Sequence, residues 1–316
     1  MKASAFLPVQ KKRTNIIISA YGRGGSTWLE AMLKAYPNVV SFYEPLSAAY
    51  QYMCKDLNFG QYHYLKPQEK KPKAINFFKG LFSQKKFAFE MINNFDRKVS
   101  LYQFRNREVN LFKFIRLNTL LPWLENNLIH SPTILLLRHP CAVVNSQINY
   151  AKNKTYNGSW TPNDKFEIDS FTQNGFDKKD FAEILSNISS NEERLAAWWS
   201  INTKIALEQC KNTHVVFYEN LLESPRGELS KIFKIFNLDI QYLDQCLSKS
   251  QTPSPTSLNS PSEHNSRLEY WTHNLSQTQI TDILSIVNRF GLGHLYNESI
   301  SPLVDESFRN YTSVQC

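Results

Sequence analysis

A short apolar run, followed at once by a glycine-rich loop and a helix, constrains the fold of this 316-residue chain more than any other feature. Residues 15–20 have the β-branched composition of a strand that is buried on both faces. The loop at 21–25 contains three glycines, and apolar residues at helical spacing predict a helix from Ser26. Residues 39–42 predict a second strand. This order indicates the opening of an α/β fold with a doubly wound, mainly parallel sheet flanked by helices.

The rest of the chain predicts a single domain over residues 1–316, since no repeat and no linker interrupts it. Further strands are predicted at 133–137 and 214–218, and helices from about 142 and over 191–211, 226–236 and 276–289. Irregular segments are predicted at 1–13, a loose basic leader, at 152–180, a surface insert or lid, and at 250–266, a loop. The stretch 50–112 has no clear pattern, and only a strand at 87–89 is predicted within it.

Charge and cysteine content narrow the class of protein without selecting a function. The formal net charge is +8, which favours anionic partners such as nucleotides, phosphate or sulfate esters, nucleic acid or anionic lipid. Five cysteines without CxxC spacing predict reduced thiols rather than a disulfide framework or a zinc site. No signal peptide and no membrane span is recognised, so a cytoplasmic protein is predicted.

The glycine loop predicts an anion site at the start of the first helix. Backbone N–H groups at a helix N-terminus bind phosphate, and Gly24 and Gly25 allow the close approach that this needs. Arg23 adds a guanidinium that can grip a phosphate or sulfate with two hydrogen bonds, and Ser26 and Thr27 add hydroxyl donors. The loop is not a Walker A motif, because Gly25 stands where that motif needs Lys. A small-molecule or nucleotide kinase and a non-catalytic polyanion-binding protein stay open as alternatives.

A second anion site is predicted after the strand at 133–137. Arg138 follows that strand directly, and Ser146 comes eight residues later on the next helix. A strand-terminal arginine and a serine two turns into the following helix can converge on one phosphate at the carboxyl edge of the sheet. Two separate anion sites suit a nucleotide that is phosphorylated at both its 5′ and 3′ positions.

These motifs resemble those of the sulfotransferases that use PAPS (3′-phosphoadenosine 5′-phosphosulfate). The run Arg23-Gly24-Gly25-Ser26-Thr27-Trp28 is similar to the family's 5′-phosphosulfate loop. The run from Arg138 through Pro140 to Ser146 is similar to its 3′-phosphate motif, and Tyr218-Glu219-Asn220-Leu221 with Pro225 fits a third, softer pattern. Because Arg23 stands where the phenol- and steroid-type enzymes usually carry Lys, the chain looks more like the carbohydrate-type and bacterial branches.

The resemblance implies a P-loop-NTPase-like three-layer fold, PAPS as donor, PAP (3′-phosphoadenosine 5′-phosphate) as product, and sulfuryl transfer without a metal. It implies a small-molecule acceptor, such as a natural product of secondary metabolism or a sugar, with no nucleic acid or membrane as partner. A homodimer is left open. Arg23 is then expected to stabilise the leaving phosphate, together with the rest of the loop.

The resemblance also directs the search for the residue that takes the acceptor's proton. The carbohydrate-type enzymes are similar in carrying an acidic residue in a Glu-Pro pair after the second strand, and Glu44-Pro45 fits that description. The alternative is His63, which stands in the region where the phenol-type enzymes place a histidine. Glu44 is preferred as the base. Arg267, after the 250–266 loop, is a further candidate for the nucleotide site, although a surface arginine is an equal alternative.

Four other residues of reactive type are interpreted as structural. His139 is expected to pack at the turn, Trp198 and Trp199 to pack in the core or on a helix, and Glu219 to be structural. The Lys-rich run 66–73 is expected to be a solvated face.

Overall fold

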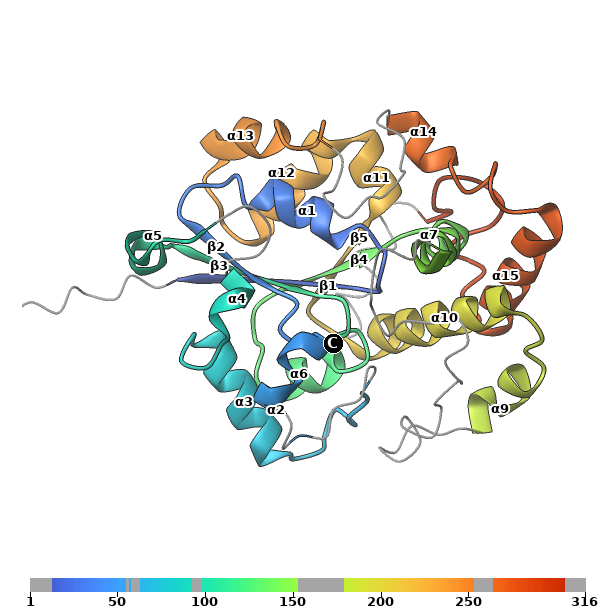
Figure 1. Cartoon of the computed structure of the whole chain (residues 1–316), viewed down its shortest axis with the longest axis horizontal. Helices are drawn as coiled ribbons and strands as arrows, with labels where there is room; N and C mark the ends of the chain where they lie inside the picture. Colours follow the sequence, from blue (N-terminus) through green and yellow to red (C-terminus); the bar gives the residue numbers. More distant parts are fainter. Residues whose placement is uncertain are drawn as a thin grey trace, which may run out of the picture.

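Five parallel strands form the central sheet of the molecule, in the order β2-β3-β1-β4-β5 (Figure 1). The computed structural model describes residues 13–54, 57, 63–92, 98–152, 179–252 and 264–304. The strands are β1 Thr14–Ala20, β2 Val39–Tyr43, β3 Val109–Phe114, β4 Thr133–Leu137 and β5 Thr213–Phe217. This architecture confirms the predicted α/β fold with a parallel sheet flanked by helices.

Helices cover both faces of the sheet (Figure 1). On one face lie α1 Ser26–Leu33, α11 Tyr218–Glu223, α12 Pro225–Ile235 and α13 Leu243–Leu247. On the other lie α3 Pro72–Phe82, α4 Phe89–Ile92, α6 Leu121–Asn127, α7 Pro140–Lys152, α10 Asn191–Gln209 and α15 Gln277–Arg289. The remaining described helices are α2 Gln51–Cys54, α5 Leu101–Asn106, α9 Lys179–Ser186 and α14 His264–Glu269, with 3₁₀ turns η1 Ala48–Tyr50 and η3 Ile240–Tyr242.

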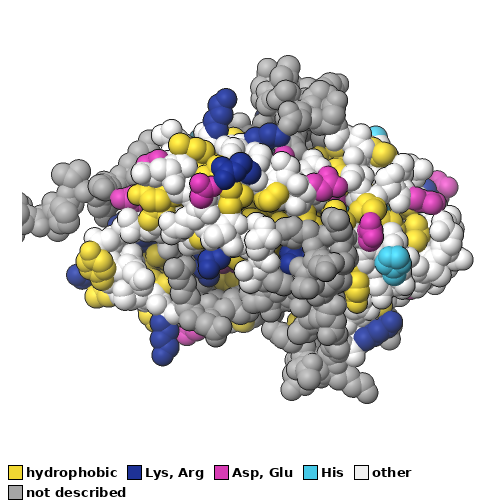
Figure 2. All heavy atoms as spheres, turned by 90° about the horizontal axis from the view of Figure 1, so that it is seen from above, with side chains coloured by type: hydrophobic (Ala, Val, Ile, Leu, Met, Phe, Trp, Pro, Cys, Tyr) yellow, Lys and Arg dark blue, Asp and Glu magenta, His cyan; other side chains and the backbone are white. Residues whose placement is uncertain are grey.

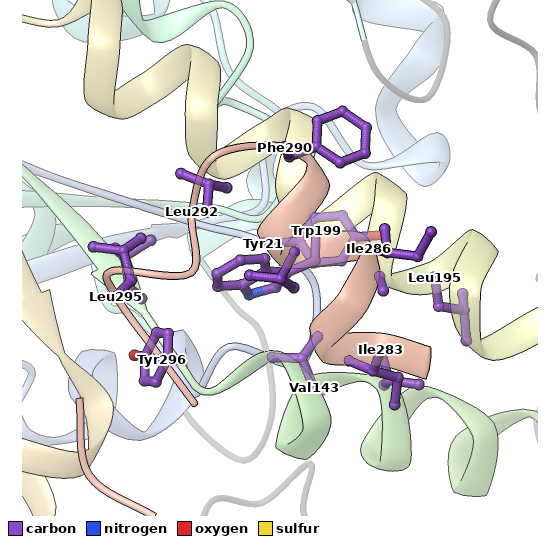
Figure 3. Close-up of a cluster of buried hydrophobic side chains, with 14 of the residues drawn as sticks. Tyr21, Val143, Leu195, Trp199, Ile283, Ile286, Phe290, Leu292, Leu295 and Tyr296 are labelled. Carbon is purple, nitrogen blue, oxygen red and sulfur yellow. The ribbon is translucent and has the colours of Figure 1, made fainter. Parts of the chain in front are cut away.

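The alternation of side chains along β1 divides the core between these two faces. Ile16 and Ile18 pack with α1, α11 and α12, whereas Ile17 packs with α3 and α6. Because successive side chains of a strand point to opposite faces, an unbroken apolar run must be covered on both sides. A third cluster joins β4 and β5 to α7, α10 and α15, where Trp199 and Tyr296 meet edge to face (Figure 3). All three clusters lie against the one sheet.

The structure confirms most of the predicted elements and corrects several. The predicted strand at 87–89 is wrong, because α4 begins at Phe89. β3 was missed, although all six of its residues are buried. Tyr218 begins α11 rather than ending a strand, and the chain is helical again from His264 onward, inside the predicted 250–266 loop. The expected leader 1–13 and the insert 152–180 lie almost wholly outside the described residues.

Neither the surface charge nor the cysteines indicate a particular function. The upper face in Figure 2 carries basic and acidic side chains interspersed with apolar and neutral ones. Cys141, Cys210 and Cys246 are buried free thiols, in keeping with the predicted reduced state. In the part of the chain that the structure describes, no helix has the length and apolar character needed to cross a membrane.

Candidate functional site at the carboxyl edge of the sheet

The predicted site residues meet at one edge of the sheet because all five strands are parallel. The loop after β1 carries Arg23, Glu44 follows β2, and Arg138 follows β4. Since β1 pairs with both β3 and β4, the loops after these strands are neighbours at the carboxyl edge. This is the edge at which open α/β sheets bind their ligands.

Two positions of the glycine loop, 24 and 25, have no room for a Cβ atom and therefore require glycine. Gly25 caps the N-terminus of α1 at φ 91°, and a Cβ there would stand 2.4 Å from Cδ2 of Tyr218. A Cβ on Gly24 would lie 2.8 Å from the Tyr21 carbonyl oxygen, whose bond from the Gly24 N–H closes the turn. The first N–H groups of α1 have no partner within the helix, so the loop presents donors at the positive end of its dipole.

Arg23 and Arg138 lie side by side across the β1–β4 pair. Arg23 Nε donates to Ser146 Oγ over 3.0 Å, and Arg138 Nη1 donates to the Arg23 carbonyl oxygen over 3.2 Å. The Arg23 guanidinium also lies over the Tyr150 ring, 5.0 Å from its centroid. The two predicted anion sites are therefore contiguous rather than separate.

A pocket opens beside these two arginines, and Arg267 joins them there. Arg23, Arg138, Ser146 and Arg267 line it, together with Ala142, Asn145, Asn149, Tyr150, Tyr270 and Trp271. Arg267 as a whole residue is only 5% exposed, so the alternative of an ordinary surface arginine is wrong. Among the described residues the lining holds three arginines and no Asp or Glu. A lining with this excess of positive charge suits an anionic ligand.

The electrostatics of the pocket point the same way. Burial lowers the pKa of Arg23, and the neighbouring Arg138 guanidinium lowers it further. Arg138 Nε is buried and has no hydrogen-bond partner among the described residues. Two like charges and an unsatisfied donor are costly in a desolvated site, and a bound phosphate would relieve both. The residues present therefore fit a phosphorylated nucleotide.

Glu44 forms a second charged centre at the same edge, paired with a lysine that the sequence analysis did not single out. Glu44 Oε1 lies 2.5 Å from Nζ of Lys113, the fifth residue of β3. The Lys113 side chain is 1% exposed, and that of Glu44 is 14% exposed. The carboxylate is therefore paired, but its lysine is buried rather than at the surface. Glu44 has a φ of 46° and Arg23 one of 71°, so both candidate residues hold left-handed backbone conformations that cost energy.

Buried polar groups surround this pair. Glu30 of α1 is 3% exposed, accepts a hydrogen bond from Ser41 Oγ over 2.5 Å, and has its pKa raised by burial. Tyr43, the last residue of β2, has the Lys113 ammonium 4.0 Å from its ring centroid. The Glu44–Lys113 pair thus lies next to a further buried carboxyl group and an aromatic ring.

Two predicted site residues, Trp28 and His63, lie outside both the lining of the arginine pocket and the Glu44–Lys113 pair. The Trp28 side chain is 2% exposed and packs edge to face on Tyr218 in the core cluster of α1. His63 is 8% exposed, and burial followed by the charge of Lys71 lowers its pKa to about 4. The charged groups acting on His63 are Lys71 and Glu69, neither of which belongs to the arginine pocket or the Glu44–Lys113 pair.

The residues interpreted as structural are confirmed in that role. The His139 ring is buried and stacks on Trp271 with ring centroids 4.5 Å apart. Glu219 is 2% exposed and accepts bonds from the His139 backbone N–H and the Tyr296 hydroxyl, while burial raises its pKa to about 7. Trp199 is 1% exposed and donates to the Arg138 carbonyl oxygen over 3.1 Å, which holds the end of β4 in place.

Lys113 is the residue that sequence reasoning missed, and a signal for it was present. A lysine within the apolar run Leu111-Phe112-Lys113-Phe114 must bring its charge into a buried strand. A buried charge of this kind is kept only with a partner, and such groups gather at functional sites.

Comparison with known families decides the identity of this site. Residues 13–277, most of the chain, match the family model described as the sulfotransferase domain. The chain belongs to the sulfotransferase family. It is a PAPS-dependent sulfotransferase, and the family's donor, PAPS, carries the 5′ and 3′ anionic groups that the two arginine sites suit. This assignment sets aside the kinase and the polyanion-binding protein.

Solved structures of sulfotransferases resemble this chain at low identity. The sulfotransferase domain of the Synechococcus PCC 7002 olefin synthase is 15% identical, covers 92% of this chain and 98% of its own, and has a TM-score of 0.46. The sulfotransferase domain from the curacin biosynthetic pathway is 13% identical, with coverages of 89% and 98% and a TM-score of 0.46. Mouse sulfotransferase SULT7A1 complexed with PAP is 11% identical, with coverages of 96% and 90% and a TM-score of 0.45. No curated protein matches by sequence.

Proposed function

We propose that this sulfotransferase moves the sulfuryl group of PAPS to a hydroxyl or amine of a small acceptor, such as a natural product or a sugar, by in-line transfer without a metal. Arg23, Gly24, Gly25, Ser26 and Thr27 would hold the 5′-phosphosulfate. Arg138, Ser146 and Arg267 would hold the 3′-phosphate, and Trp28 would support the loop through its packing. PAPS supplies the sulfuryl group, and the residues of this chain position the reactants and manage charge and protons.

The observation that carries the proposal is the pocket lined by Arg23, Arg138 and Arg267 beside the glycine loop. Arg23 belongs to the loop and also lines the pocket, so one guanidinium lies between the two predicted anion sites. A cation fixed before the reaction stabilises negative charge that develops on a leaving phosphate, because no reorganisation is needed at that moment. Arg23 is therefore the proposed electrostatic catalyst.

Glu44 is the proposed general base. It stands at the same sheet edge as Arg23, its side chain is 14% exposed, and a carboxylate within hydrogen-bond reach of an acceptor can take the acceptor's proton. His63 is the weaker candidate, because its charged neighbours belong to another part of the molecule. The single-domain organisation and the cytoplasmic location stay predictions from the sequence, and a homodimer stays open.

The test combines an acceptor screen with two variants. Radiolabelled PAPS is offered with a panel of small alcohols, phenols, amines and sugars, and turnover is then measured with the best of them. Glu44→Gln should lower kcat by about 10²–10⁴-fold, the range for loss of a general base, and should change PAP affinity little. His63→Ala should keep most of the activity.

Two results would refute the proposal. Near-normal turnover in Glu44→Gln, with an inactive but folded His63→Ala, would move the base to the histidine. Transfer of label to a polysaccharide or protein, and to none of the small acceptors, would overturn the acceptor class.

A further inference from the structure

A tyrosine ring lies under the arginine that the proposed function places at the leaving phosphate. The Arg23 guanidinium stands over the ring of Tyr150, 5.0 Å from its centroid. Tyr150 belongs to the last turn of α7, is partly buried, lines the arginine pocket, and is given no role by any motif. Since Arg23 comes from the loop after β1, the contact joins two segments that lie far apart in the sequence.

Two residues on one face of α7 hold the Arg23 side chain. Ser146 and Tyr150 are one helical turn apart, so both side chains lie on the same face of the helix. Ser146 Oγ accepts the hydrogen bond from Arg23 Nε over 3.0 Å, and the Tyr150 ring lies against the guanidinium. The hydrogen bond holds one edge of the guanidinium, and the ring limits its tilt.

The backbone that carries Arg23 is fixed by other contacts. Arg138 Nη1 donates to the Arg23 carbonyl oxygen over 3.2 Å. Gln147 Nε2 of α7 donates to the Gly22 carbonyl oxygen over 3.1 Å. Removing the Tyr150 ring should therefore loosen the Arg23 side chain without opening the loop.

An aromatic face suits this position better than a carboxylate would. The face of the ring carries partial negative charge, which attracts a cation. It takes up none of the N–H donors of a guanidinium, because these lie in the guanidinium plane. A carboxylate would occupy such donors and would repel an anionic ligand. The ring can therefore stabilise Arg23 without competing with a phosphosulfate group for it.

The same arrangement recurs at the second arginine of the pocket. The Arg138 guanidinium lies over the Tyr218 ring, 4.5 Å from its centroid. Tyr218 also packs edge to face on Trp28 in the buried core of α1, so its substitution would disturb the fold. Tyr150 is only partly buried and is the better residue for a test.

We propose that Tyr150 is a positioning residue that keeps the Arg23 guanidinium aligned with the leaving phosphate of PAPS. The inference rests on the proposed function, in which Arg23 stabilises the negative charge that develops there. Because this charge is fully present only late in the reaction, misalignment of Arg23 should lower kcat more than it weakens PAP binding.

The experiment compares Tyr150→Leu with Tyr150→Phe by steady-state kinetics, at saturating PAPS and with the best small acceptor. Tyr150→Leu should lower kcat about two- to thirtyfold, the range that corresponds to loss of a cation–π contact. Tyr150→Phe keeps the ring and should stay within about twofold of the wild type. PAP affinity, measured by calorimetry, should fall less than kcat in Tyr150→Leu. Thermal melting with and without PAP verifies that both variants are folded.

A second background separates this role from a direct contact with the nucleotide. If the ring acts only through Arg23, adding Tyr150→Leu to Arg23→Ala should lower kcat no further. Tyr270→Leu is the matched control, because Tyr270 also lines the pocket but has no ring contact with an arginine among the described residues. Its effect on kcat should be the same factor in the wild type and in Arg23→Ala.

The outcomes are distinguishable from a failure of the proposed function. A Tyr150→Leu enzyme with the wild-type kcat, or a Tyr150→Phe enzyme as impaired as Tyr150→Leu, overturns the role of the ring. So does a loss of kcat that persists in the Arg23→Ala background. These results leave the role of Arg23 intact as long as Arg23→Ala is itself impaired. A near-normal kcat in Arg23→Ala overturns the proposed role of Arg23, and this inference with it.

Discussion

The two halves of the sheet's carboxyl edge are built in different ways. On the β1–β4 side, the anion-binding groups other than Arg267 of α14 lie in two continuous strand–loop–helix units, one after β1 and one after β4. On the β2–β3 side, the charged centre joins Glu44 to Lys113, which is 69 residues away in the sequence. The first half is encoded locally, and the second exists only once β2 and β3 have paired.

This difference has an energetic counterpart. The β1–β4 side gathers like charges, Arg23 beside Arg138, and is completed by an anionic ligand. The β2–β3 side pairs opposite charges within the protein, with the lysine fully buried. We therefore expect substitutions on the β2–β3 side to cost folding stability in addition to any loss of turnover, whereas those on the β1–β4 side should cost donor binding and turnover and leave folding stability largely unchanged.

The largest effect is expected in the stability of the β2–β3 side. Glu44→Ala leaves the Lys113 ammonium buried without its carboxylate, and should lower the free energy of unfolding by about 3–5 kcal/mol. Adding Lys113→Met removes the stranded charge and should restore most of that loss. Denaturant unfolding measures both. Glu69→Ala is the matched control, because the Glu69–Lys71 pair is exposed and should contribute less than about 1 kcal/mol.

If Glu44→Ala and Glu69→Ala lower the free energy of unfolding by the same amount, the buried Lys113 ammonium does not need Glu44 as its charge partner. The contrast between an internally compensated side and a ligand-compensated side would then be wrong.

Arg23→Ala should show the next effect, in turnover rather than folding. Loss of one fixed donor to a developing negative charge costs about 10²–10³-fold in kcat, and the deficit should persist at saturating PAPS. Arg138→Ala should change kcat much less, because it is proposed to hold a phosphate that does not react. Steady-state kinetics that gave the reverse order would exchange the two roles.

The sequence predicts those parts of the fold that are encoded within one segment, and it misses those that depend on pairing between distant segments. The elements β1, α1, β2, β4, α10, β5 and α15 have apolar patterns that can be recognised within one segment. β3 was missed because Asn110 and Lys113 interrupt its apolar run. Each has a partner from another segment: the Asn110 amide donates to Asn15 of β1, and the Lys113 ammonium pairs with Glu44 after β2. Local patterns cannot show partners that only tertiary pairing provides.

The site follows the same rule. Arg23, Arg138 and Ser146 were found because each keeps a fixed place relative to a strand end. The pairing of Glu44 with Lys113 and the contacts of Tyr43 depend on two strands whose register cannot be derived from either one. The strand predicted at 87–89 failed for a related reason: Phe87 packs on Phe42, but Phe89 is 63% exposed and begins a helix, so aromatic composition alone was misleading.

The most direct test of the arginine pocket compares two ligands that differ by one phosphate. Calorimetry in EDTA measures the binding of PAP and of adenosine 5′-phosphate to the wild-type protein and to Arg138→Ala. Hydrogen bonds to charged groups contribute about 1.5–3 kcal/mol, so the preference of the wild type for PAP should fall about ten- to a hundredfold in the variant. Binding of adenosine 5′-phosphate should barely change. A PAP preference that survives in Arg138→Ala, with both affinities reduced by the same factor, would contradict the assignment of this pocket to the 3′-phosphate.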